Sequence, residues 1–389
     1  MKIVQSCVGK FHHFDLARQF ERQGCLKAIF TGYPRRKLTG EKLPSGKVHT
    51  FPWLHAPYMV MGRFMYGTPL HRDFAWINSM SFDRHVSRSA LLADCDVFVG
   101  LSGTGLLSGR RVQQCGGRYI CDRGSSHIRF QDAILRDEYS RWEMPYTGVD
   151  PRMIEQEEAE YATADMVTVA STFVRESFKS RGFPEEKLAT IPYGVNLSQF
   201  HPVGEPAPET FDLLFVGGVT LRKGVPYLLE AFAKLKHPRK RLRIVGGHTT
   251  ETRSFVSRLP TDGVEFLGHR PQDELIRLMS ESHALVLPSI EDGFGLVMAQ
   301  AMACGCALIA SRNTGALDLF TDGVEGYIIE PRDSNALLEA LGRMAEDREG
   351  LARMREAALR RVREIEGWTQ YGDRFVEICE GLVARGGRN

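Results

Sequence analysis

The sequence contains little that would support several common classes of function. Its 389 residues carry 50 basic and 48 acidic side chains, and the formal charge of +2 gives no support for a nucleic-acid partner. The eight cysteines include no C-x-x-C pair and no Cys/His block with zinc spacing. We therefore expect reduced thiols in apolar surroundings, no nucleic-acid partner and no resident metal.

Long apolar runs are also missing. The longest nearly apolar stretch, 296–310, contains Gln300 and Gly305 and is shorter than the roughly 20 residues that span a bilayer. The first residues lack the long apolar core of a signal peptide. We expect a cytoplasmic protein, and we consider peripheral contact with the inner membrane face below.

What is present predicts a large α/β protein. A chain of 389 residues with 43% hydrophobic content is long enough for two or three domains with substantial cores. Lys2–Val4 and Ala28–Phe30 have the composition of strands, and the helical pattern of 11–23 lies between them. A strand, a turn at Gly9, a helix and a second strand form a βαβ unit, which predicts a parallel sheet with a right-handed crossover.

The segment 201–209 contains three prolines and is predicted to link two domains. A strand at Leu213–Val216 follows it and runs into the Gly217–Gly218 turn. We therefore place an N-terminal domain at 1–203 and a C-terminal domain at 204–366, with a terminal helical segment at 367–389.

The most informative stretch is 289–307. A short apolar strand at 284–288 precedes it, Gly293 and Gly295 form a turn, and 296–303 has the composition of a short helix. A strand, a glycine turn and a helix start place backbone N–H groups over the carboxyl edge of a sheet. Such groups can bind a phosphate or a sugar hydroxyl without any side chain.

Residues 292–305 resemble the donor-site signature of family 4 glycosyltransferases, which are retaining enzymes with the GT-B fold. That signature has two glutamates separated by seven residues, and this chain has Asp292 and Gln300 in their places. The stretches 160–165, 171–177 and 191–202 are also similar to the family. The resemblance covers nearly all of the C-terminal domain and the last third of the N-terminal domain, and it is weakest over residues 35–92.

The resemblance implies a GT-B protein: α/β, with two doubly wound, Rossmann-like parallel-sheet domains facing each other across a cleft. The acceptor would bind in 1–203 and the nucleotide sugar in 204–366, and the helix in 367–389 would cross back onto the first domain. The implied reaction is retaining transfer of a hexose or similar sugar from a UDP- or GDP-linked donor to a hydroxyl of a glycan or lipid-linked acceptor. Such a hexosyltransferase would serve polysaccharide or glycoconjugate biosynthesis and would need no cofactor and no metal.

The resemblance also implies roles for individual residues. Arg222 and Lys223 would hold the donor diphosphate, because fixed cations stabilise the charge that the leaving nucleotide gains. His127 would position the reacting sugar, and Asp292 would accept hydrogen bonds from sugar hydroxyls. The further donor-binding residues are Gly217, Gly218, Gly268, His269, Arg270, Glu291, Gly293, Phe294, Gly295, Leu296 and Gln300. The acceptor-side residues are Gly9, Lys10 and Arg123.

Gln300 departs from the family pattern. The glutamate at this place in the family accepts hydrogen bonds from both ribose hydroxyls. A glutamine offers one carbonyl acceptor and one NH₂ donor, so one of the hydroxyls must act as acceptor. We expect an altered contact with the ribose and not a loss of activity.

The segment 53–92 has two interpretations, because aromatic and methionine residues alternate there with basic ones. It forms either an amphipathic surface for an anionic membrane or lipid-linked acceptor, or a helical flap packed on the N-terminal sheet. Asp94-Cys-Asp96 is similar to the D-x-D of metal-dependent glycosyltransferases, but it precedes a buried strand at 97–100 and is interpreted as the start of that strand.

Two rival functions stay open. One is another GT-B chemistry on a nucleotide sugar or sugar phosphate, such as epimerisation or phosphorolysis. The other is a non-catalytic binding protein that kept the fold and lost a glutamate.

Overall fold

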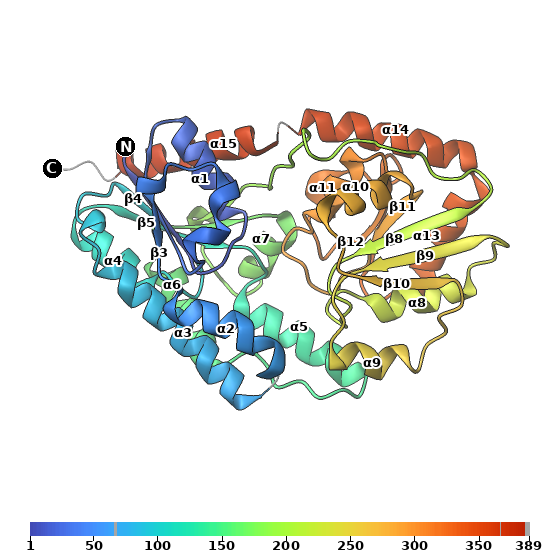
Figure 1. Cartoon of the computed structure of the whole chain (residues 1–389), viewed down its shortest axis with the longest axis horizontal. Helices are drawn as coiled ribbons and strands as arrows, with labels where there is room; N and C mark the ends of the chain where they lie inside the picture. The colour runs from blue at the N-terminus through green and yellow to red at the C-terminus, as the bar shows by residue number, and fades with distance from the viewer. Residues whose placement is uncertain (66–67, 366, 386–389) are drawn as a thin grey trace.

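A computed structural model describes residues 1–65, 68–365 and 367–385. Two sheets organise the chain, and every pair of neighbouring strands in them is parallel (Figure 1). The first has the order β3-β2-β1-β4-β5-β6-β7 and the second the order β10-β9-β8-β11-β12-β13. Their strands are β1 (Ile3–Cys7), β2 (Leu26–Thr31), β3 (Val48–Thr50), β4 (Val97–Leu101), β5 (Arg118–Arg123), β6 (Met166–Val169) and β7 (Leu188–Thr190), then β8 (Phe211–Val216), β9 (Lys240–Val245), β10 (Val264–Gly268), β11 (Ala284–Leu287), β12 (Ala307–Ser311) and β13 (Gly326–Ile329).

Both sheets are doubly wound, and in each the strand order reverses once. The reversals lie between β1 and β4 and between β8 and β11. Ligands of such sheets bind in the crevice outside the carboxyl ends of the strands at this point. The central strands are buried on both faces, as the fully buried β11 and β12 show, which explains their nearly continuous apolar sequences.

The first domain has seven helices among the described residues. They are α1 (His13–Arg22), α2 (Pro52–Met65), α3 (Pro69–Ser87), α4 (Leu106–Gln114), α5 (Ile128–Arg141), α6 (Pro151–Thr163) and α7 (Thr172–Lys179). The second domain contains α8 (Val225–Lys234), α9 (Thr250–Val256), α10 (Gln272–Ser280), α11 (Val297–Ala303), α12 (Ala316–Leu319), α13 (Ser334–Glu346) and α14 (Arg348–Glu364). The break between the sheets, from Thr190 to Phe211, contains the predicted boundary at 203/204.

The last helix, α15 (Gly367–Arg385), returns to the first domain and lies beside α1 (Figure 1). The ring of Phe375 meets that of Phe20 edge-on at 5.6 Å, and Asp373 accepts a hydrogen bond from Gln23 at 2.8 Å. The helix therefore packs on the first domain, directly after α14 of the second. Residues 366 and 386–389 of the predicted segments lie outside the described residues.

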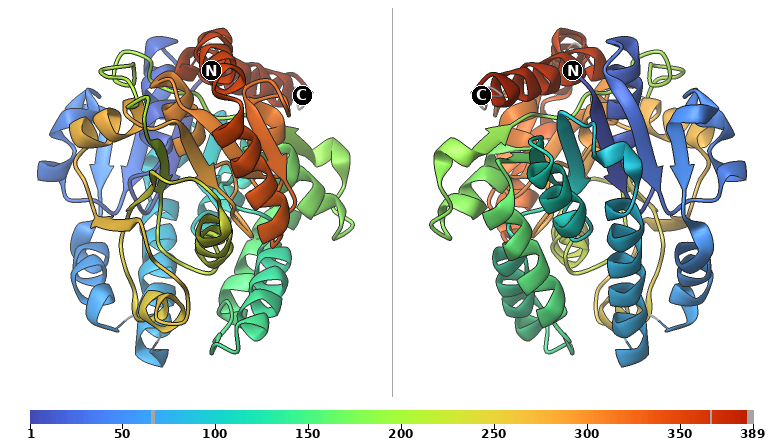
Figure 2. Two further views of the ribbon diagram at one scale, coloured as in Figure 1. Left: turned by 90° about the vertical axis from the view of Figure 1, so that its right-hand side faces the viewer. Right: turned by 90° about the vertical axis from the view of Figure 1, so that its left-hand side faces the viewer.

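The segment 53–92 folds into α2 and α3, which pair with each other on the opposite side of the molecule from α14 and α15 (Figures 1 and 2). Phe82 and Val86 of α3 are buried, so part of the segment packs on the first domain as a flap. Trp53 keeps 76% of its surface exposed and Val60 keeps 61%. The segment thus has both a packed face and an exposed apolar one, and its residues 66–67 lie outside the described residues.

Several polar contacts dock the two domains through α5 and α7. Tyr139 of α5 donates to Glu251 of α9 at 2.6 Å, and Thr172 at the start of α7 donates its hydroxyl to Asp318 at 2.7 Å. Glu138, buried on α5, accepts from Arg332 at 2.6 Å. Because these groups are partly or fully removed from water, they fix the relative position of the domains more firmly than exposed ion pairs would.

All eight cysteines are free thiols, and only Cys115 is not buried. Burial raises the pKa of the Cys95 thiol to about 12, which fits the expectation of reduced core thiols. Among the described helices, none combines the length and the apolar composition needed to cross a membrane.

Candidate functional site

The carboxyl edge of the second sheet brings several predicted donor-binding residues together. The N–H of Gly217 donates to the carbonyl of Val245, and the N–H of Gly246 donates to the carbonyl of Gly268, each at 2.9 Å. A side chain at Gly246 would come within 1.7 Å of the Gly217 carbonyl oxygen. The turns after β8, β9 and β10 therefore lie side by side, and their glycines place no side chains over the backbone there. His269, next to these turns, is exposed.

The turn that carries Arg222 and Lys223 is held against the segment after β11. Gly224 has φ +67°, and a Cβ there would lie 1.9 Å from the carbonyl oxygen of Pro288, so only glycine fits. The carbonyl of Arg222 accepts a hydrogen bond from the N–H of Ile290 at 2.9 Å. Two adjacent cations are thereby fixed beside the loop that contains the predicted sugar-binding residues.

Each of the two cations is paired with one of two adjacent carboxylates. Nε of Arg222 donates to Oε2 of Glu291 at 2.7 Å, and Nζ of Lys223 forms an ion pair with Asp292. Within the described part of the chain, the terminal nitrogens of Arg222 have no hydrogen-bond partner. The Arg222 side chain is 35% exposed, so it can meet an anion from solvent while it keeps its bond to Glu291.

Glu291 joins the two domains. Oε1 accepts from the N–H of Ser126 at 3.0 Å and from its hydroxyl at 2.8 Å, and Oε2 accepts from Gln131 at 3.1 Å. Burial opposes ionisation of this fully buried carboxyl, but Arg222, Ser126 and Gln131 outweigh it and lower the pKa to about 2. Both oxygens of this predicted donor-binding residue are thus occupied by protein groups.

The glycine turn after Asp292 packs directly on the first domain. A Cβ at Gly293 would lie 1.8 Å from the carbonyl oxygen of Gly124, and the Gly293 carbonyl accepts from the Ser171 hydroxyl at 2.6 Å. The buried ring of Phe294 meets the ring of Tyr193 edge-on at 5.3 Å. The predicted donor turn therefore lies where the two domains meet.

Asp292 precedes the glycine turn, and Gln300 lies on α11, the helix that follows the turn. The N–H of Asp292 donates to the carbonyl of Asn313 at 3.0 Å, which fixes the backbone before the turn. Leu296 is the residue before α11, and Gln300 is half-buried on that helix. Within the described residues the side-chain amide of Gln300 has no hydrogen bond, whereas Arg270, also predicted to bind the donor, pairs with Glu274 at 3.4 Å.

His127 lies immediately after Ser126, but its ring is directed into the first domain. Nδ1 accepts from the N–H of Arg129 at 3.2 Å, which caps α5, and the ring meets Tyr161 at 5.2 Å and Phe178 at 4.9 Å. Burial lowers the pKa of His127 to about 4, so the ring is neutral at physiological pH. The structure does not bring this ring together with Arg222, Lys223 and Asp292, and contact with a sugar would require another rotamer.

The acceptor-side residues Gly9 and Lys10 line a cavity of about 280 Å³ in the first domain. Its other walls are largely aromatic or polar: Val8, Phe11, Tyr33, His55, Tyr58, Met59, Ala75, Asn78 and Ser79. Lys10 is half-exposed there and forms an ion pair with Glu41. A cavity that combines aromatic rings with a few polar groups is typical of sites for small molecules, and the assignment of Gly9 and Lys10 to the acceptor stays a prediction.

Arg123, the third acceptor-side residue, is buried and bonded only to protein groups in the described structure. Its nitrogens donate to the Ser126 carbonyl at 3.0 and 3.1 Å, to Gln131 at 3.0 Å and to Glu157 at 3.0 Å. Ser126 and Gln131 are also the residues that hold Glu291. Arg123 therefore shapes the surface that receives the second domain.

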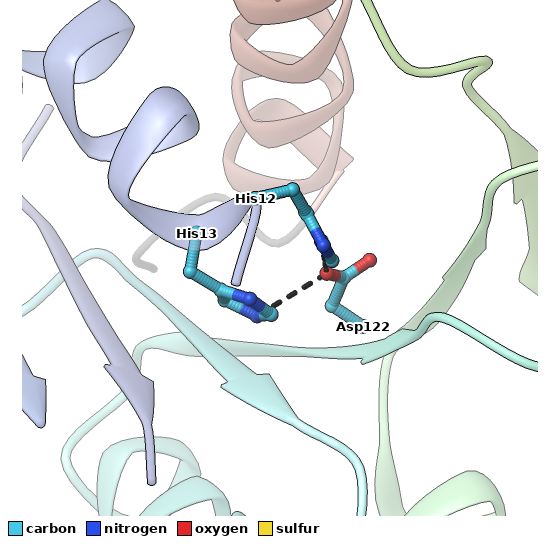
Figure 3. A group of neighbouring side chains, drawn as sticks. All are labelled: His12, His13 and Asp122. Atoms are coloured by element: carbon cyan, nitrogen blue, oxygen red, sulfur yellow. Dashed lines mark hydrogen bonds and ion pairs between the residues drawn. The ribbon is translucent and has the colours of Figure 1, made fainter. Parts of the chain in front are cut away.

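A cluster that sequence reasoning did not single out lies nearby: His12, His13 and Asp122 each place one nitrogen or oxygen within 4.8 Å of the others (Figure 3). Nε2 of His12 and Oδ2 of Asp122 are 2.7 Å apart. Nε2 of His13 lies 3.2 Å from the same carboxylate oxygen. One oxygen of Asp122 therefore faces a ring nitrogen of each histidine. The only feature of the sequence that could have indicated this cluster was the position of His12 soon after the Gly9 turn.

The strand order, the two facing domains and the returning helix α15 define a GT-B architecture. Comparison with solved structures supports this fold. A sucrose-phosphate synthase from Thermosynechococcus elongatus has a TM-score of 0.72 at 22% identity, covering 99% of this chain and 100% of that one. The HepE protein of Anabaena, solved in complex with UDP and glucose, has a TM-score of 0.69 at 16% identity, covering 98% and 100%.

Residues 199–361 match the family model "Glycosyl transferases group 1". Among curated relatives, the MMP alpha-(1->4)-mannosyltransferase of Mycolicibacterium hassiacum is 28% identical over 227 residues, which are 57% of this chain and 55% of that protein. The chain spans about half the length of the curated relatives it matches. Together with the fold, these matches support a place in a GT-B glycosyltransferase family.

Proposed function

We propose that the chain transfers a sugar from a UDP- or GDP-linked donor to a hydroxyl of a glycan or lipid-linked acceptor, with retention of configuration. The observation that carries the proposal is the pair Arg222 and Lys223, fixed beside the glycine turn at the carboxyl edge of the second sheet. The UDP and glucose bound by the Anabaena neighbour support a nucleotide-sugar donor.

The two cations have a direct chemical use in this reaction. The diphosphate gains negative charge as the glycosidic bond breaks, and cations already fixed in place stabilise it without reorganisation. In the proposal, the terminal nitrogens of Arg222 bind the diphosphate while Nε stays on Glu291. Lys223, now paired with Asp292, neutralises the second phosphate and steadies the carboxylate that accepts sugar hydroxyls. This arrangement needs no metal ion.

The remaining donor-side residues have lesser roles in the proposal. The turns at Gly217–Gly218 and Gly268–Arg270 leave room for the nucleotide base and ribose, and Gln300 contacts the ribose in place of a glutamate. Glu291 acts through position: it holds the Arg222 side chain and the first domain together. In the rotamer of the structure, His127 supports the adjoining loop. It would reach the sugar only after its side chain had turned to a different rotamer.

A turnover assay with a stereochemical readout tests the proposal. Wild-type protein is incubated without metal with UDP- and GDP-sugars and a set of sugar acceptors, and nucleotide release is followed. We expect one donor class to turn over and the product's anomeric proton, seen by NMR, to have the donor's configuration. An inverted product would contradict retention, and no release from any donor would contradict transfer itself.

We further propose that the exposed apolar face of α2 and α3 meets a membrane that carries the acceptor, which would place the protein at the inner membrane face in polysaccharide or glycoconjugate biosynthesis. Trp53, Val60, Leu70 and Ile77 are at least half exposed there. Such an exposed group of large apolar side chains marks a surface for a partner or membrane. Trp53→Ser with Val60→Ser should reduce sedimentation with anionic vesicles, whereas Leu317→Ser, an exposed leucine of the second domain, should not.

A further inference from the structure

A cavity of about 400 Å³ lies in the first domain, among the start of α5, the helix α6 and the segment that joins α7 to β7. Every described residue that lines it belongs to 127–187, so none comes from the second domain. Of the residues predicted to hold the nucleotide sugar, only His127 reaches it. Cavities of about 300–1,000 Å³ with a few polar groups are typical of sites for small molecules. This cavity is therefore a candidate for a site apart from the donor turn.

His127 presents to this cavity an N–H that has no partner in the described part of the chain. The residue lines the cavity although only 5% of its surface is exposed. Its Nδ1 accepts from the N–H of Arg129 at 3.2 Å, and burial lowers its pKa to about 4, so the neutral ring carries its proton on Nε2. Nε2 is not among the fully buried atoms that lack a hydrogen bond, so it keeps some accessible surface. An acceptor in the cavity can therefore reach this donor.

Two cations line the same space. They are Arg181 and Lys187, and neither forms an ion pair with a carboxylate of the described residues. A terminal nitrogen of Arg181 donates to the carbonyl of Arg129 at 3.5 Å, and Nζ of Lys187 donates to the carbonyl of Ala164 at 3.3 Å. Both cations keep further N–H groups for a ligand. The charge of Arg181 lies close enough to His127 to disfavour protonation of its ring, which places these two donors near each other.

The remaining walls supply little opposing charge. Glu158 is the one acidic residue of the described chain that lines the cavity, and its two oxygens accept from Nε and a terminal nitrogen of Arg129. This bidentate pair offsets its charge. Tyr161 donates its hydroxyl to buried Glu157 at 2.5 Å, which leaves its ring, together with that of Phe183, as an apolar wall. The cavity therefore has cationic donors on one part of its surface and aromatic carbon on another.

We propose that this cavity binds a small molecule that carries a phosphate group, at a site separate from the donor site. The phosphate oxygens accept hydrogen bonds from Nε2 of His127, from the Arg181 guanidinium and from Nζ of Lys187, and the carbon skeleton packs on Phe183. A phosphate monoester offers three acceptor oxygens and a charge of about −1.5 to −2 at pH 7, which matches one neutral donor and two cations. A carboxylate has only two oxygens and one charge. Binding needs no transfer reaction, so this site is independent of the proposed function.

Isothermal titration calorimetry with glucose 6-phosphate, inorganic phosphate and glucose tests the site. We expect glucose 6-phosphate to bind more tightly than phosphate, because its carbon skeleton reaches the apolar wall, and glucose not to bind. Arg181→Ala and Lys187→Ala should each weaken binding by about 10- to 100-fold, since each removes a charge-assisted hydrogen bond. Lys179→Ala is the matched control. It removes a neighbouring lysine that pairs with Glu185 at 2.9 Å and does not line the cavity, and it should keep the wild-type Kd.

Two further readouts separate this cavity from other anion sites and from a structural role. Arg222→Ala and Lys10→Ala should leave the Kd of glucose 6-phosphate within about twofold of wild type, because both cations lie outside the cavity. In protein labelled with ¹⁵N-histidine, the ring nitrogens of His127, assigned with His127→Asn, should shift when glucose 6-phosphate is added and not when glucose is. Arg181→Ala should abolish that shift and still melt as wild type does, because Arg181 is exposed.

The contrary results differ from one another. Equal Kd values in wild type, Arg181→Ala and Lys187→Ala, or an unchanged His127 signal, would take the ligand out of this cavity. Loss of binding in Arg222→Ala alone would assign the phosphate group to the donor site. Glucose binding as tightly as glucose 6-phosphate, or no binding of either phosphate compound, would remove phosphate from the assignment. Absence of nucleotide-sugar turnover contradicts the proposed function alone, whereas these binding results decide the cavity.

Discussion

The hydroxyl of Ser126 donates to Oε1 of Glu291 at 2.8 Å and thereby ties a loop of the first domain to the donor loop of the second. The same carboxylate holds Arg222 through its other oxygen at 2.7 Å. Domain docking and the position of Arg222, the cation that we propose binds the diphosphate, thus depend on one buried group. The first prediction follows from this coupling.

Replacing Ser126 with alanine removes one hydrogen bond to a buried charge. Such a bond contributes about 1.5–3 kcal/mol, so Ser126→Ala should lower the free energy of unfolding by about that amount in chemical denaturation at neutral pH. Ser125→Ala is the matched control, because Ser125 is half-buried on the same loop and makes no side-chain hydrogen bond within the described residues. Equal effects of the two substitutions would contradict the importance of the Ser126 bond.

Arg222→Ala should lower turnover by a factor of hundreds, because one donor that stabilises developing charge contributes about 3–4 kcal/mol to the barrier. Steady-state kinetics with the preferred donor gives the value. Arg312→Ala, which removes an exposed arginine paired with Glu330 in the same domain, should leave turnover close to wild type. A loss of less than about tenfold in Arg222→Ala would contradict its assigned role.

Gln300→Ala should raise the donor KM more than it lowers kcat. The amide is expected to contact the ribose, which does not change during the reaction, so its contact energy is the same in the bound substrate and the transition state. Kinetics over a range of donor concentrations separates the two constants. A fall in kcat with little change in KM would place Gln300 in the chemical step and refute the ribose assignment.

The free energy of unfolding should depend on pH through the ionisation of Glu291. Its pKa in the folded protein, about 2, is below the ordinary value of 4.5. Its contribution is therefore complete above about pH 4.5 and is lost as the pH falls towards 2. A Glu291→Gln protein should lose less stability than wild type between pH 6 and pH 3, by about 2 kcal/mol at pH 3. Glu377→Gln, at an exposed glutamate, should keep the wild-type slope, and parallel slopes for all three proteins would refute the assignment.

Much of the fold could be predicted because its signals are local. The apolar runs at β11 and β12 predict buried parallel strands, and the glycines after β8 and β11 predict turns over the carboxyl edge. The resemblance then supplied the GT-B arrangement and the return of α15. Within 53–92 the pattern could not decide between a packed flap and a surface, since the segment has a face of each kind.

The candidate site was harder to predict where long-range partners decide the role of a side chain. Glu291 stands beside Asp292 in the sequence, but only the fold shows that Ser126, 165 positions away, donates two hydrogen bonds to one of its oxygens. The position of His127 after β5 was predicted, whereas the direction of its ring follows from Tyr161 and Phe178. The His12–Asp122 pair likewise depends on the neighbouring positions of β1 and β5 relative to β4, which no local pattern indicates.

The most direct test of the central claim is nucleotide binding measured by thermal shift without metal. Wild type and Arg222→Ala are compared with UDP, GDP and ADP and their sugars. At 100 times its Kd a ligand adds about 2.7 kcal/mol to stability, which is readily seen as a raised midpoint. The account predicts that UDP or GDP raises the midpoint of wild type and that Arg222→Ala loses most of the shift. No shift with any nucleotide, or an equal shift in both proteins, would contradict a donor site at Arg222.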